Sequence, residues 1–81
     1  MFKSLYTVTL IIVDPYDHSP KTISTTLFED REMALDEYRL LSNKYDMTEK
    51  YSDGMATFRS VGKLESDWKI FDAAVELVKL W

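Results

Sequence analysis

The sequence predicts an α+β fold, in which an antiparallel sheet of three to four strands carries a helix, near residues 30–46, on one face. Two observations favour this fold class. Residues 5–13 and 21–28 alternate along the chain with the period of a strand. Residues 28–47 instead repeat their apolar side chains with the period of a helix. Depending on the last segment of the chain, the element order is ββαββ or ββαβα.

The N-terminal apolar run predicts a buried strand. Its continuous apolar face consists of Tyr6, Val8, Leu10 and Ile12. The run is much shorter than the about 20 residues that a membrane-spanning helix needs, so we expect no membrane association. A loop with two prolines follows at residues 14–20, and the alternating segment 21–28 then completes an antiparallel hairpin.

The helical segment has two apolar stripes. It begins at Asp30, which is a good N-cap residue. The stripe that suits docking on the sheet consists of Ala34, Tyr38, Leu41 and Tyr45. A second row recurs every seven residues and consists of Met33, Leu40 and Met47. Since one stripe is enough to dock a helix, the second row needs another partner, which is the rest of the same fold, a second copy of the chain or a foreign protein. For the last two, we expect the row to be at least partly exposed.

The second half of the chain has weaker patterns. Residues 48–54 are polar and predict a connector that ends in a turn at Asp53 and Gly54. Residues 55–63 alternate as a weak strand. Residues 66–81 are ambiguous, because their charged side chains fall on one stripe of a helical projection, which favours a helix by a narrow margin, while residues 75–81 also suit a buried strand.

Length, composition and charge fit a single cytoplasmic domain over residues 1–81. The chain of 81 residues is 46% hydrophobic, which is sufficient for one core. It has no cysteine, which excludes disulfides and thiolate chemistry, and a secreted domain of this size usually needs such cross-links. The net charge of −4 argues against a nucleic-acid partner, since that binding draws on Lys and Arg.

The residues expected to bind a partner combine the second row of the helix with other large apolar side chains and with acidic residues. Met and aromatic side chains are enriched at protein interfaces. The carboxylates of the first helical turns, which include Asp36 and Glu37, would also face a basic partner, although they complement the helix dipole as well. The predicted protein-binding residues are Met33, Leu40, Met47, Trp68, Phe71, Trp81, Glu29, Asp30 and Glu32.

The sequence has no motif that specifies catalysis, a metal or a cofactor. The single histidine, His18, lies near Asp14 and Asp17, but this spacing matches no metal-ligand pattern and fits a solvated loop. Two glycines are too few for a phosphate-binding glycine loop. We therefore predict a non-enzymatic protein-interaction module. The first alternative is a structural homodimer or complex subunit, and the second is a small enzyme or metal-dependent protein.

In its layout the chain resembles small phage-encoded accessory proteins. These proteins pair a hairpin, here residues 6–28, with a helix that opens on an acidic-hydrophobic pattern, here FEDREMALDEY, and with a closing aliphatic segment, here VELVKLW. The resemblance spans most of the chain and rests on layout. It implies a small inhibitor or modulator that binds a larger host protein, and it assigns no functional residues.

Overall fold

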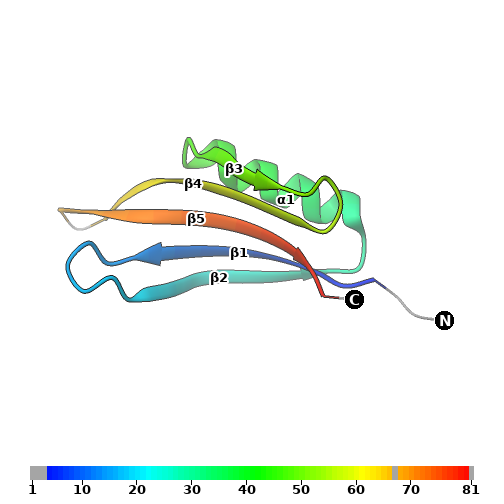
Figure 1. Cartoon of the computed structure of the whole chain (residues 1–81), viewed down its shortest axis with the longest axis horizontal. Helices are drawn as coiled ribbons and strands as arrows, with labels where there is room; N and C mark the ends of the chain where they lie inside the picture. The colour runs from blue at the N-terminus through cyan, green and yellow to red at the C-terminus, as the bar shows by residue number, and fades with distance from the viewer. Residues whose placement is uncertain (1–3, 67, 81) are drawn as a thin grey trace.

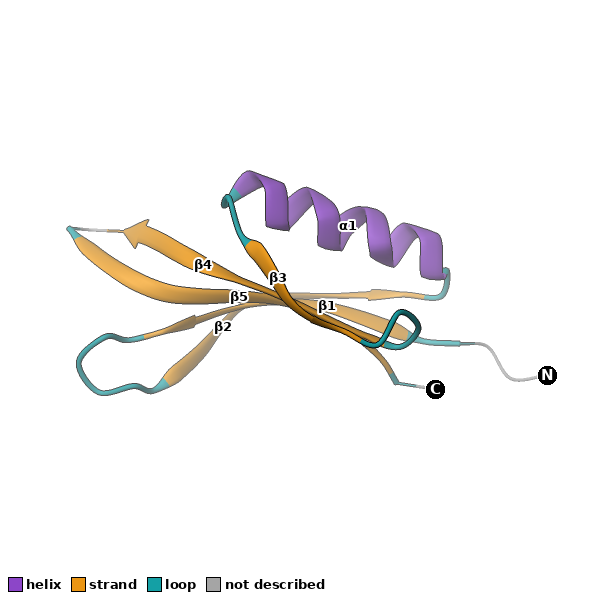
Figure 2. Ribbon diagram, turned by 45° about the horizontal axis from the view of Figure 1, so that its top comes forward, coloured by secondary structure: helices purple, strands orange, loops and turns teal. Residues whose placement is uncertain are grey.

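The computed structural model describes residues 4–66 and 68–80, which form a five-stranded antiparallel sheet with one helix on one face (Figure 1, Figure 2). The elements are β1 (Tyr6–Val13), β2 (Pro20–Phe28), α1 (Arg31–Lys44), β3 (Thr48–Ser52), β4 (Thr57–Ser66) and β5 (Lys69–Lys79). Their order across the sheet is β2-β1-β5-β4-β3. The α+β class is confirmed, whereas the sheet has five strands rather than three to four.

The first hairpin and the helix form where the sequence predicts them. β1 and β2 pair antiparallel, with one register shift at which Ile23 of β2 falls between two paired residues. α1 begins after Asp30, whose carboxylate accepts a 2.8 Å hydrogen bond from the backbone N–H of Glu32. It ends at Lys44, and Asp46 then turns the chain with a φ of 53°.

The C-terminal segment is a strand, so the prediction that favoured a helix there is wrong. β5 lies between β1 and β4 in the sheet, and Val75 and Leu77 are fully buried beneath α1. Asp72 and Glu76 both lie on the opposite face, because side chains alternate along a strand, and each pairs with a basic side chain of β4. Lys69 and Lys79, which share the helical stripe with Asp72 and Glu76, fall on the other face of this strand at its two exposed ends, so the charges divide between the faces while most of the apolar residues between them are buried.

The segment after the helix is also a strand rather than a polar connector. β3 is exposed throughout and pairs with β4 at the edge of the sheet. An edge strand of this kind contributes backbone hydrogen bonds without burying an apolar face, so its sequence shows no alternation. β4 begins two residues later than the predicted segment 55–63 and extends to Ser66.

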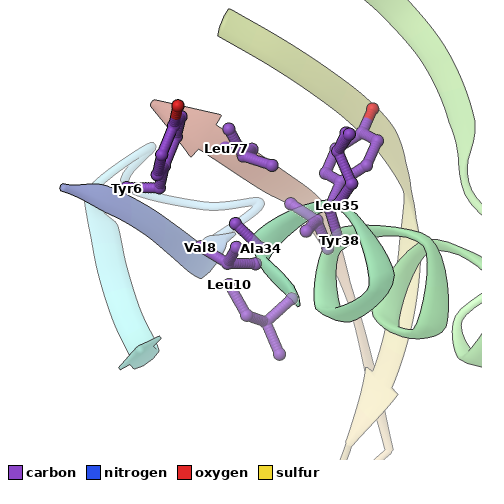
Figure 3. Close-up of a cluster of buried hydrophobic side chains, with 8 residues drawn as sticks. Tyr6, Val8, Leu10, Ala34, Leu35, Tyr38 and Leu77 are labelled. Carbon is purple, nitrogen blue, oxygen red and sulfur yellow. The ribbon is translucent and has the colours of Figure 1, made fainter. Parts of the chain in front are cut away.

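The core lies between α1 and the helix-facing side of β1 and β5 (Figure 3). Its buried residues are Tyr6, Val8, Leu10, Ala34, Leu35, Tyr38, Val75 and Leu77. The predicted contact between the first strand and the docking stripe of the helix is thus confirmed for most of its members. Leu41 and Tyr45 pack at the margin of this core, and Leu35, which the stripe did not include, is buried. Ile12 of the predicted strand face is half-buried and does not belong to the core.

Candidate protein-binding surfaces

The outer side of α1 carries a groove with apolar and acidic walls. Met33 and Leu40 are 58% and 62% exposed, because α1 docks on the sheet through its opposite side. They line a depression of about 380 Å³ together with Phe28, Asp36 and Glu37. We call these five residues the α1 groove. An exposed apolar pair beside carboxylates suits a protein partner that offers an apolar side chain and a basic group.

The acidic residues at the start of the helix have partly structural roles. Asp30 caps α1 through its carboxylate. Glu29 and Glu32 are exposed, and a carboxylate oxygen of Glu32 lies 3.6 Å from Nη1 of Arg31. Arg31 also donates from Nη2 to the carbonyl oxygen of Gly54 at 3.2 Å, which joins the start of α1 to the turn between β3 and β4.

Met47, the last member of the predicted row, lies apart from the α1 groove. It follows the end of α1, is half-buried and packs against the core. A Cβ atom placed on Gly62 would lie 2.9 Å from Cγ of Met47, so the absence of a side chain at Gly62 makes room for this packing. The seven-residue spacing does not place Met47 beside Met33 and Leu40, because the helix ends before Met47 and Asp46 changes the direction of the chain.

Trp68 and Phe71 lie on the β4–β5 hairpin, whose tip is at the end of the molecule away from the start of α1 (Figure 1). Trp68 is fully exposed and has a φ of 71°, a conformation that L-residues other than Asn and Asp seldom adopt. Phe71 is half-buried and lines a second depression, of about 640 Å³, with apolar residues of β1 and β2 and with Tyr45. Trp81 lies outside the described residues.

The carboxylates near His18 hold the shape of their loop. Oδ1 of Asp14 accepts a 2.8 Å hydrogen bond from the backbone N–H of Tyr16. Asp17 accepts from the hydroxyl of Ser19 at 2.6 Å and from its backbone N–H at 2.9 Å, and these bonds lower the pKa of Asp17. Both carboxylates thus act as turn acceptors within the loop.

Two further findings concern the whole described chain. Over residues 4–66 and 68–80, no group of three or more His, Cys, Asp and Glu side chains is placed to hold a metal ion. In the same part of the chain, no helix has the length and apolar character needed to cross a membrane.

Comparisons with protein-family models, curated proteins and solved structures give no match for this chain. The structure brings Met33 and Leu40 together and places Trp68 and Phe71 elsewhere. Sequence reasoning did not single out Phe28 as a groove residue, and its position directly before the helix start was the one available signal.

Proposed function

We propose that this chain is a non-enzymatic protein-interaction module that binds another protein through the α1 groove. The observation that carries the proposal is the exposure of Met33 and Leu40 on a helix whose opposite side already forms the core. Contiguous apolar surface of this kind often marks a protein-binding site. The proposed role is that of a small inhibitor or modulator of a larger cytoplasmic protein, as in the phage-encoded accessory proteins that the chain resembles in layout.

The lining of the α1 groove sets the chemistry of the expected partner. Phe28, Met33 and Leu40 offer a contact for an apolar side chain, and the flexible Met33 adapts to its shape. Asp36 and Glu37 favour Lys or Arg beside that side chain, since charge-assisted hydrogen bonds are stronger than neutral ones. The net charge of −4 adds long-range attraction to a basic surface. We therefore expect a partner with a protruding apolar side chain flanked by basic residues.

The test compares the amount of partner protein that is captured by the wild-type chain, by the Leu40→Glu variant and by the Asn43→Glu variant. Both variants add one negative charge to an exposed position of α1, but Asn43 does not line the groove. We expect Leu40→Glu to keep the melting temperature and to lose the captured protein, because it places a charge in a dry contact. Asn43→Glu should retain it. Equal capture by the two variants would contradict a role for the α1 groove.

A structural homodimer is the second candidate function, and the exposed edge of β2 favours it. β2 forms one edge of the sheet and is exposed over almost its whole length. An edge strand with free backbone groups is a ready partner for another strand.

A further inference from the structure

The two edges of the sheet differ in their protection against pairing with another chain. β3, at one edge, is five residues long, includes the charged residues Glu49 and Lys50, and has a register shift in its pairing with β4. Short length, charge and irregular register are the features by which natural edge strands avoid further pairing. β2, at the other edge, is nine residues long, and its single charged residue, Lys21, lies near its start. Most of β2 therefore lacks the features that protect β3 against further pairing.

The part of β2 best suited to further pairing is its C-terminal half. Residues 24–28 pair with β1 in a regular register, after the shift at Ile23. This half contains Ser24, Thr25, Thr26, Leu27 and Phe28. Thr and large apolar residues are favoured in strands, and Leu27 is 63% exposed. Its outward backbone groups face no other strand within the described residues.

We infer that β2 pairs antiparallel with β2 of a second copy of this chain, across a two-fold axis near Thr25 and Thr26. The two sheets then form one continuous sheet of ten strands. The charges along the edge favour a second copy over a foreign strand. Lys21 lies at the start of β2, whereas Asp36 and Glu37 lie beside Phe28 at its end. Antiparallel pairing sets the basic end of each copy toward the acidic end of the other, so the edge is complementary to itself.

The area of the edge suits a weak dimer. An axis at Thr25 lets residues 22–28 of the two copies pair, a length of about 23 Å at about 3.3 Å per residue, and a sheet with one helix layer is about 20 Å thick. Each copy would then bury about 450 Å², which is below the standard range and typical of weak, concentration-dependent association. Because the protected β3 is at the outer edge of each copy, the assembly stops at two.

This dimer rests on the second candidate function, the structural homodimer, and deepens it by naming the pairing strand and the position of the two-fold axis. The decisive measurement is the mass of the purified chain by light scattering, over a range of concentrations. We expect the mass to rise from 9.5 kDa toward twice that value. A wild-type chain that stays at 9.5 kDa at all concentrations would overturn the dimer, while capture through the α1 groove would stand or fall separately.

A pair of matched variants locates the contact. Thr25→Lys brings two ammonium groups together near the two-fold axis. We therefore expect the dimer of this variant to dissociate at protein concentrations about tenfold or more above those at which the wild-type dimer dissociates. Thr48→Lys makes the same change on the β3 edge and should leave the dimer intact. Both threonines are exposed, so both variants should fold, which circular dichroism checks. An equal effect of the two variants would contradict pairing through β2.

Disulfide trapping gives a second readout, because the chain has no cysteine of its own. Opposite residues of antiparallel strands have Cα atoms about 4.5–5.5 Å apart, within the range of a disulfide. Under mild oxidation, Thr25→Cys or Thr26→Cys should form a covalent dimer faster than Thr48→Cys does. No excess over the Thr48→Cys control at either position would overturn the proposed register.

Discussion

The hydroxyl oxygen of Tyr38 lies 2.6 Å from the hydroxyl oxygen of Ser60, and both side chains are buried. The Tyr38 hydroxyl also donates to Oε1 of Glu49 at 2.9 Å. Its ring packs against Phe58 with the ring centroids 5.7 Å apart. One side chain thus joins α1 to both β3 and β4, and it fixes the rotation of α1 that leaves Met33 and Leu40 outward.

Replacing this phenol tests its contribution to stability. Tyr38→Phe removes the hydroxyl and leaves the buried hydroxyl of Ser60 without its partner, so we expect a loss of about 1–3 kcal/mol of unfolding free energy. Urea unfolding measures the loss. Tyr51→Phe is the control, since Tyr51 is exposed on β3 and should change little. A similar effect of the two variants would show that the Tyr38 hydroxyl does not contribute.

The same hydroxyl predicts how stability changes at high pH. Burial raises the pKa of Tyr38, because the phenolate is poorly solvated in the core. A group whose pKa is raised by folding contributes its full stabilisation at pH values below its pKa in the unfolded chain, which is about 10 for tyrosine. This stabilisation is lost as the pH rises through the pKa of the folded state. Above about pH 10, the wild-type chain should therefore lose stability more steeply than Tyr38→Phe. Parallel pH profiles from urea unfolding of the two proteins would contradict this linkage.

The elements that the sequence predicted are those with a strong local signal. The alternation in β1 and the cap at Asp30 depend on neighbouring residues, so the first hairpin and α1 follow from them. β3 and β5 depend on tertiary context. β3 gains only edge pairing. The four charges of β5 share one stripe of a helix but divide between the two faces of a strand, and the strand forms because pairing with β1 and β4 buries Val75 and Leu77.

The candidate binding residues also divide into those that a local pattern places and those whose position depends on tertiary contacts. Met33 and Leu40 are placed by helical periodicity alone, and the sequence suffices to predict that they lie on one side of α1. The position of Met47 depends instead on Gly62, which lies on a strand 15 residues further along the chain. Trp68 was predicted to bind a partner together with Met33 and Leu40, but its place at a hairpin tip depends on β5 being a strand.

A double-mutant cycle tests the contact between Gly62 and Met47. A Cβ atom at Gly62 would lie 2.9 Å from Cγ and 3.3 Å from Cα of Met47, so Met47 would have to move. We expect Gly62→Ala to destabilise the protein by about 1–3 kcal/mol through overpacking. In the Met47→Ala background the loss should be smaller, since Cγ is gone. Additive effects of the two substitutions in urea unfolding would show that they do not interact.

The rotation of α1 predicts an order among its leucines. Leu35 is buried in the core, whereas Leu41 is half-buried at its margin. Leu35→Ala should therefore cost about 2–5 kcal/mol, with a smaller loss for Leu41→Ala, because less apolar surface leaves the core. Leu40→Ala, in the α1 groove, should change the free energy of unfolding least. A reversed order of Leu35 and Leu41 would contradict the helix rotation.

The left-handed conformation of Trp68 predicts a stabilising substitution. A φ of 71° costs an ordinary L-residue about 1 kcal/mol, and the fully exposed side chain of Trp68 gives little packing in return. Trp68→Gly should therefore raise the midpoint of urea unfolding, because glycine adopts this conformation without strain. The matched control is Lys69→Gly, which places a glycine at the first residue of β5 and should lower the midpoint. A lower midpoint for both variants would show that the indole supports the hairpin. A higher midpoint for Trp68→Gly alone would show that the fold does not need Trp68, so that its apolar ring is free to contact a partner.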